Sequence, residues 1–304
     1  MNTPLAESYR LCGKIARRTG KNFYYSFLVM PAEKRAAMCA IYAFMRRSDD
    51  IADSTANPDV AAEGLRQWRA TVDAALRGET TGEPTLPALA DTVKRYRIEP
   101  RYFHELLDGT EMDQRVTRYQ TFDELYRYCY HVASVVGLVV LPVFGYKDKA
   151  ALVPAEACGI AFQLTNILRD IKEDAKRGRI YIPAEDLRRF GYTEEDLLAF
   201  RYTPEFVNLM RFECDRASKY FDIARAALGN EDKRFFFAAR IMWSIYAHTL
   251  RRIMRSNYNV FERRISVPGL LKVLIAFRYW LSNTLKYSWL GRSWHPGNPS
   301  PQTE

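Results

Sequence analysis

The sequence predicts an all-α protein with a single domain. Apolar residues recur at helical spacing along nearly the whole chain of 304 residues, and no stretch has the alternation typical of a strand. The chain contains only 15 Gly and 14 Pro and is rich in Ala, Leu, Arg, Glu and Lys, which favour helix. No low-complexity linker divides it, so one helical bundle over residues 1–304 is the simplest interpretation.

The expected helices are separated by residues typical of turns, such as "NPD" at 57–59 and "RGRIYIP" at 177–183. Residues 128–145 are apolar on nearly every side, which predicts a central position in the bundle. In chain order, the expected helices span residues 4–18, 31–54, 58–78, 86–97, 100–116, 121–145, 148–175, 204–228, 231–258 and 268–288.

The C-terminal part, residues 265–304, has a mixed character. Residues 269–294 combine Leu, Ile, Phe, Trp and Tyr with four basic side chains. Such a helix can lie in a membrane interface, but a last helix that packs on the bundle carries the same pattern. We favour packing on the bundle, and association with a membrane surface remains the alternative.

The chain is basic, with a net charge of +9. This charge fits nucleic acid, an anionic membrane or a small polyanionic substrate, and composition alone does not choose among them. Five scattered cysteines and four histidines form no pattern of zinc ligands. Unpaired cysteines suit a reducing compartment, so we expect a cytoplasmic protein, with or without peripheral contact to the membrane.

The stretch "NILRDIKED" places Asn166, Asp170 and Asp174 four residues apart. On a helix these side chains fall within roughly 80° of arc and about 12 Å of length, and Gln163 joins the same face. Carboxylate and amide oxygens in a row are hard ligands that suit Mg²⁺, which often shares its coordination shell with phosphate oxygens.

A second acidic set lies in "YAFMRRSDDIAD", residues 42–53. Asp49 and Asp53 form an i, i+4 pair, and Arg46 and Tyr42 extend the same helix face. Like charges at this spacing destabilise an isolated helix by a few tenths of a kcal/mol, which a divalent cation would offset.

Each acidic set alone is more typical of a solvated helix face. Together they indicate a site, because both lie in otherwise apolar helices and both include an arginine, Arg46 or Arg169. Two facing acidic helices can hold two or three Mg²⁺ and, through them, a diphosphate leaving group. Its departure leaves a carbocation, which needs dry aromatic walls. Candidates for these walls, each of which is also an ordinary core residue, are Phe23, Tyr24, Tyr25, Phe27, Tyr42, Tyr130 and Tyr246.

Four segments of the chain resemble the squalene and phytoene synthase family of head-to-head prenyl transferases, over roughly residues 8–267. The segments are "GKNFYYSFLVMPAEKRAAMCAIYAFMRRSDDIAD" (20–53), "YCYHVASVVG" (128–137), "AFQLTNILRDIKEDAKRGRIYIP" (161–183) and "NYNVFERRISV" (257–267). The resemblance implies an isoprenoid-synthase fold with a central active-site cavity. Ser134 departs from the glycine that many members have at its position.

The resemblance also implies roles for the candidate residues. The Mg²⁺ ligands would be Asp49, Asp53, Asn166, Asp170 and Asp174. The contacts to diphosphate would be Lys21, Asn22, Arg46, Gln163, Arg169 and Arg263. The walls of the prenyl channel would be Phe23, Phe27 and Tyr42. Tyr130 and Tyr246 would face the reacting carbons, with Arg169 as the third catalytic residue, and Lys176, Arg177 and Arg179 would form a basic flap beside the second motif.

The product depends on the length of the prenyl chain, which these motifs do not set. The preferred reaction joins two farnesyl diphosphates to presqualene diphosphate, with or without onward conversion to squalene, as in hopanoid biosynthesis. The alternative joins two geranylgeranyl diphosphates to phytoene. No "GxGxxG" follows a strand, but reducing members of the family use NADPH without that motif, so its use stays open. A non-catalytic basic protein that binds membranes is the alternative from another class; nucleic acid is not expected, because the acidic motifs would repel it.

Overall fold

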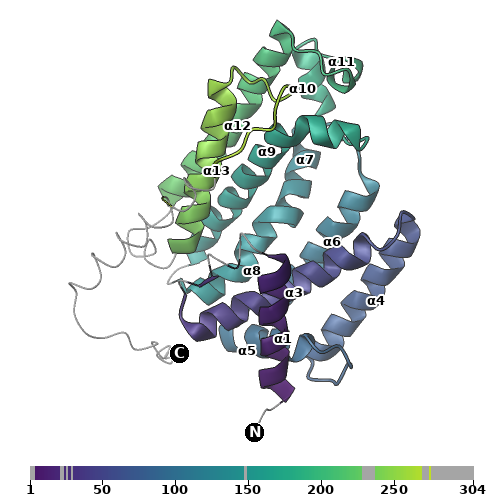
Figure 1. Cartoon of the computed structure of the whole chain (residues 1–304), viewed down its shortest axis with the longest axis vertical. Coiled ribbons are helices and arrows are strands. Elements are labelled where there is room, and N and C mark those ends of the chain that lie inside the picture. The colour runs from purple at the N-terminus through teal and green to yellow at the C-terminus, as the bar shows by residue number, and fades with distance from the viewer. Residues whose placement is uncertain are drawn as a thin grey trace, which may run out of the picture.

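The computed structural model describes residues 4–20, 24, 27–28, 30–146, 149–227, 237–268 and 274. These residues form an all-helical bundle (Figure 1). Its elements are α1 (Pro4–Thr19), α3 (Ala32–Ala52), α4 (Pro58–Leu76), α5 (Leu86–Tyr96), α6 (Arg101–Arg115), α7 (Phe122–Cys129), the π-helical turn η1 (Tyr130–Ser134), α8 (Val135–Phe144), the 3₁₀ turn η2 (Lys149–Ala151), α9 (Leu152–Lys176), α10 (Ala184–Arg189), α11 (Glu194–Leu198), α12 (Pro204–Ala227) and α13 (Phe237–Arg255).

Most predicted helices are confirmed to within a few residues. The helix expected over 121–145 is instead two α-helices joined by the π turn η1, and the short helices α10 and α11 were not predicted. The helix expected over 268–288 lies almost entirely outside the described residues. Within the described part of the chain, extended pairing is limited to one parallel bridge between Arg118 and Ile180.

Local sequence explains several helix ends. Asn57 caps α4 by accepting the Asp59 N–H at 2.9 Å, with Pro58 at the first helical position. Thr121 caps α7 in the same way, through the Glu124 N–H. α5 ends at Arg97, which adopts a left-handed conformation.

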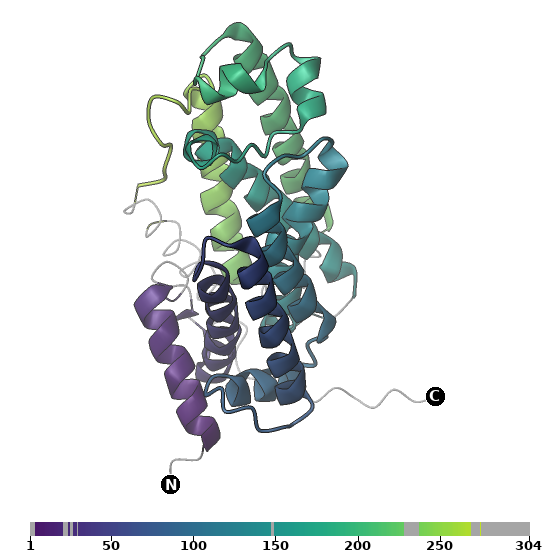
Figure 2. The ribbon, with the colours of Figure 1, turned by 90° about the vertical axis from the view of Figure 1, so that its right-hand side faces the viewer.

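The helices enclose two hydrophobic clusters. The first lies among α1, α3, α4, α5, α6 and α8, and the second lies among α7, α9, α12 and α13. The long helix α9 packs against α12, η1, α8 and α13, so it runs through the middle of the bundle, whereas α1 lies outside α3 (Figures 1 and 2). Two stretches, Phe122–Phe144 and Lys149–Lys176, are long and apolar enough to cross a membrane, but half or more of each is buried inside the bundle, as for core helices.

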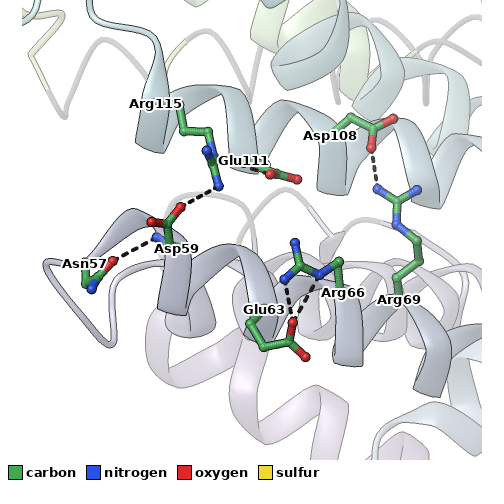
Figure 3. Close-up of polar contacts among 8 residues, drawn as sticks. All are labelled: Asn57, Asp59, Glu63, Arg66, Arg69, Asp108, Glu111 and Arg115. Atoms are coloured by element: carbon green, nitrogen blue, oxygen red, sulfur yellow. Dashed lines mark hydrogen bonds and ion pairs between the residues drawn. The ribbon is translucent and has the colours of Figure 1, made fainter.

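Polar contacts on the surface hold α4 against α6 (Figure 3). Arg115 of α6 pairs with Asp59 of α4 at 3.0 Å, and Arg69 of α4 pairs with Asp108 of α6. Exposed pairs of this kind contribute at most about 1 kcal/mol each. At that size they add little to the packing that holds α6, which carries part of the site described below.

The π turn η1 lies between two glycines on neighbouring helices. A Cβ on Gly159 of α9 would lie 2.3 Å from the Ser134 Cα, and a Cβ on Gly109 of α6 would lie 3.0 Å from the His131 backbone. Ser134 Oγ also donates to the Glu156 carbonyl at 2.8 Å. Ser134 therefore packs in close contact with Gly159.

Candidate functional site

A cavity of about 390 Å³ lies between α3, α6 and the α7–η1–α8 segment. Its lining combines apolar side chains with three carboxylates and an arginine. The apolar side includes Phe44, Leu106, Val132 and Val136. The polar side includes Arg46, Asp49, Asp53, Asp113 and Tyr128. A space of this composition can hold a charged head group and an apolar chain together.

The first acidic motif lies where the sequence predicts it, along one side of α3. Asp49 reaches solvent at the cavity, but the surrounding protein raises its pKa to about 6 through desolvation, and the charges of Asp53 and Asp113 contribute. Arg46 forms an ion pair with Asp50, yet its Nε is buried and has no hydrogen-bond partner among the described residues. That unsatisfied donor is suited to an anionic ligand.

The second motif lies on α9, and its central carboxylate is held by two arginines. Asp170 accepts Arg169 Nε at 2.9 Å and Arg264 Nε at 2.8 Å. Burial by itself would raise the pKa of Asp170, but the two guanidinium groups hold it below its ordinary value. Asn166 donates to Gln163 at 3.3 Å, which confirms that these two amides share a helix face.

Asp174 differs from Asp170, because it forms no ion pair with any described residue. Desolvation raises its pKa to about 6, and the charges of Asp170 and Asp113 add to the shift, while Arg177 and Arg179 oppose it. A partly buried carboxylate without a cationic partner is available to a metal ion.

Asp113 of α6 lies between the two motifs and was not among the candidate residues predicted from the sequence. Its charge acts on Asp49 of the first motif and on Asp174 of the second. It accepts the hydroxyls of Tyr128 at 2.7 Å and Tyr181 at 2.8 Å. Because both motifs lie close to one residue, the structure brings them together as predicted. No local pattern marks Asp113, which in the sequence is one acid near a helix end.

Of the two tyrosines in "YCY", Tyr128 and not Tyr130 lines the cavity. Tyr130 donates its hydroxyl to Glu105 at 3.0 Å and packs between the two hydrophobic clusters. Tyr128 was not among the candidates predicted from the sequence, and the role expected for Tyr130 at the reacting carbons remains a prediction. Burial raises the pKa of Tyr128 far above its ordinary value, so the phenol stays neutral.

Other predicted residues lie farther from this cavity. Phe27 and Tyr42 pack in or against the first hydrophobic cluster, and Tyr42 Oη is 3.2 Å from Thr19 Oγ1. Tyr246 stacks on Phe162 with ring centroids 4.5 Å apart, beside the second cluster. None of the three lines the cavity described here. Their predicted contacts with a prenyl chain remain predictions, and Lys21, Asn22 and Phe23 lie outside the described residues.

Of the two arginines in "FERR", Arg264 contacts the second motif. Its neighbour Arg263, which is exposed like Arg264, was expected to contact the diphosphate, and that role remains a prediction. The chain reaches Arg264 through a tight turn in which Asn257 and Tyr258 both have positive φ. Lys172 of α9 donates a hydrogen bond from Nζ to the Phe261 carbonyl, which links the turn to the helix that carries the motif.

The donor set fits Mg²⁺, although no group of three or more acidic, His or Cys side chains converges on one point within the described residues. Mg²⁺ usually takes one or two carboxylates from the protein and completes its shell with water and phosphate oxygens. Asp49, Asp53 and Asp174 form no ion pair with a described residue, and Glu173 Oε2 is buried without a hydrogen-bond partner in the same part of the chain. These oxygens are free to hold a cation.

Comparison with known proteins places the chain among characterised relatives. The family model described as "Squalene/phytoene synthase" matches residues 16–270. A 15-cis-phytoene synthase of Synechocystis sp. is 38% identical over 289 residues, covering 90% of this chain and 85% of the relative. Phytoene synthase 1 of Arabidopsis thaliana is 36% identical over 296 residues, covering 93% and 68%.

Two solved structures share the fold. A dehydrosqualene synthase in complex with ligand matches with a TM-score of 0.79 and 28% identity, covering 94% of this chain and all of that one. A squalene synthase, HpnC from Alicyclobacillus acidocaldarius, matches with a TM-score of 0.77 and 30% identity, covering 84% and 96%.

Proposed function

This chain belongs to the squalene/phytoene synthase family, and we propose that it joins two geranylgeranyl diphosphates head to head to form phytoene. It has the all-helical, single-domain isoprenoid-synthase fold, and it is a prenyltransferase of the squalene/phytoene synthase type. The non-catalytic alternative is therefore set aside. The proposal concerns the substrate and the roles of the individual residues.

The proposal of a C20 substrate rests on the names of the curated relatives. Those from cyanobacteria, plants and a mycobacterium bear the name phytoene synthase, at 34–38% identity over 87–93% of this chain. The preference for farnesyl diphosphate, drawn from the sequence alone, is revised accordingly. The C15 reaction is kept as the second candidate, because the two solved structures are named dehydrosqualene and squalene synthases.

In the proposed reaction, each of two steps releases one diphosphate and one proton. The first step forms a cyclopropylcarbinyl diphosphate, and the second ionises it and rearranges it to the hydrocarbon. The side chains that would hold Mg²⁺ are Asp49, Asp53, Asn166, Asp170 and Asp174. When bound, Mg²⁺ supplies the charge that stabilises the departing diphosphate.

The cavity residues divide the remaining work. Arg46 lines the cavity beside the first motif, where its guanidinium group can bind a phosphate oxygen. Phe44, Leu106 and Val132 provide apolar walls that exclude water from a carbocation. Tyr128, neutral and held by Asp113, offers a ring and a fixed dipole beside those walls.

The test is to incubate the purified protein with Mg²⁺ and labelled C15 or C20 diphosphate, with and without NADPH, and to identify the product. We expect a C40 hydrocarbon from the C20 substrate, with a yield that NADPH does not change. A C30 product from the C15 substrate, with none from the C20 substrate, would refute the proposal in favour of the second candidate.

Two variants make the test specific to the site. Asp170→Asn keeps the shape of the second motif but removes a charge, and diphosphate release should fall by a factor of at least about 100. Asp59→Asn removes a carboxylate from the surface contact between α4 and α6, and activity should stay close to that of the parent protein (Figure 3). Normal diphosphate release by Asp170→Asn would overturn the assignment of the second motif.

A further inference from the structure

Arg179 lies beside Asp174 but directs its guanidinium group elsewhere. The Arg179 N–H donates to the Asp174 carbonyl at 2.9 Å, and both residues line a small cavity at the end of α9. The side chain nevertheless turns to α6, where Nη1 donates to Asp113 Oδ2 at 3.1 Å and Nη2 donates to the Asp113 carbonyl at 2.9 Å. Asp174, the nearer acid along the chain, gains no ion pair from it.

Several neighbouring contacts stabilise the pair between Asp113 and Arg179. Its Oδ1 accepts the Tyr128 and Tyr181 hydroxyls, and these two rings stack with centroids 5.2 Å apart. Behind them, the Ile180 N–H donates to the Thr117 carbonyl at 2.9 Å, which ties the segment carrying Arg179 to the end of α6. Both oxygens of Asp113 are therefore occupied by protein donors, so this carboxylate is poorly placed to bind a cation itself.

The alternative partner for Arg179 is Asp174. A guanidinium group next to a partly buried carboxylate normally forms an ion pair with it, as Arg169 and Arg264 do with Asp170 on the same helix. If Arg179 did the same, both acids of the second motif would be neutralised by arginine. A cation would then have to displace a guanidinium group to reach either of them.

We propose that Asp113 is a positioning residue that draws Arg179 away from Asp174 and so leaves the Asp174 carboxylate free for a divalent cation. The inference rests on the proposed function, because it concerns the metal that accompanies a diphosphate substrate. It adds a residue that acts on the metal site through another side chain and does not touch the metal.

The experiment measures metal binding directly, without turnover. Mn²⁺ is titrated against the full chain in the presence of inorganic diphosphate, and free Mn²⁺ is followed by electron paramagnetic resonance. In Asp113→Asn, Arg179 loses its partner and pairs with Asp174, so the Kd for Mn²⁺ should rise about 3–5-fold, the equivalent of one partly exposed ion pair. Arg179→Gln alone should bind Mn²⁺ at least as well as the parent protein.

The double variant decides the mechanism. With Asp113→Asn and Arg179→Gln combined, no guanidinium group remains to compete, and the Kd should return to the parent value. Tyr181→Phe is the matched control, because it removes one hydrogen bond from Asp113 but leaves the pair with Arg179, and its Kd should not change.

Other outcomes overturn the proposal. An unchanged Kd in Asp113→Asn would mean that the pair does not control Asp174. A double variant as weak as Asp113→Asn would mean that Asp113 binds the metal or supports the fold. Weaker binding by Arg179→Gln, a measurement that stands even if Asp113→Asn does not fold, would mean that Arg179 holds the diphosphate. Failure of the proposed function looks different: the parent protein would itself bind no Mn²⁺ with diphosphate and form no prenyl product.

Discussion

Gly159→Ala is expected to destabilise the protein through a clash at the centre of the bundle. The added Cβ would lie 2.3 Å from the Cα and 2.5 Å from the N of Ser134. Both are backbone atoms, so no side-chain rotation relieves the contact. To reach an ordinary van der Waals distance of about 3.4 Å, α9 and η1 must separate by about 1 Å.

The magnitude follows from three contributions. Overpacking of a core costs about 1–3 kcal/mol, and loss of the hydrogen bond from Ser134 Oγ to Glu156 costs about 1 kcal/mol more. Replacement of glycine by alanine inside a helix offsets about 1 kcal/mol of this loss, because alanine has the higher helix propensity. The net loss in free energy of unfolding is therefore about 1–3 kcal/mol, with the upper end favoured because the opposing atoms belong to the backbone.

The assay is chemical denaturation followed by circular dichroism, with Gly13→Ala as the matched control. Gly13 lies inside α1, and an added Cβ there meets no atom within 4 Å, so this variant should be stabilised by up to about 1 kcal/mol. Equal stability of the two variants would refute the steric argument. So would full rescue of Gly159→Ala by Ser134→Gly, because the clash is with backbone atoms that this second change leaves in place.

Three further predictions concern the site. Tyr128→Phe should lower kcat by about tenfold or more and by more than Tyr130→Phe does, because only Tyr128 lines the cavity; steady-state kinetics with radiolabelled substrate test this. Folding raises the pKa values of Asp49 and Asp174 from 3.8 to about 6, so between these pH values the metal-free folded protein binds more protons than the unfolded chain. Its melting temperature should therefore rise as the pH falls from 7 to 5. Metal with diphosphate should raise the melting temperature more at pH 7.5 than at pH 5, because the carboxylates are then ionised. Arg264→Gln should raise the KM for the prenyl diphosphate about 3–10-fold with folding intact, as judged by thermal melting.

The features that could be predicted from the sequence are those set by residues close together in the chain, such as helices and their faces. The acidic motifs lie on helices with the expected faces, because a spacing of four residues acts within one helix. One such signal was overlooked. Thr193 and Asp196 form a capping box, which marks the start of α11 and could have predicted this short helix.

The rest of the site depends on which face of one helix meets another. Tyr128 and Tyr130 are two residues apart, so they point to different sides of the segment, and both sides are buried against other helices. Nothing local distinguishes the side that faces a cavity from the side that faces packed helices. The same holds for Arg263 and Arg264, whose roles are set by the turn at Asn257 and Tyr258.

The π turn η1 also accommodates one residue more than two regular α-helical turns would hold between Tyr128 and Val136. Tyr128, Val132 and Val136 all line the cavity, although steps of four residues in a regular α-helix would carry the third about 80° away from the first. The wider turn absorbs that drift. Deletion of one residue between 132 and 136 would leave a continuous α-helix in which Val136 follows Tyr128 by seven residues, or about 700°, so Val136 would stay within about 20° of the face that Tyr128 occupies. Insertion of one more residue there, without a second wide turn, would instead rotate α8 by about 100° and direct Val136 out of the cavity. The segment therefore tolerates the loss of one residue more readily than the gain of one.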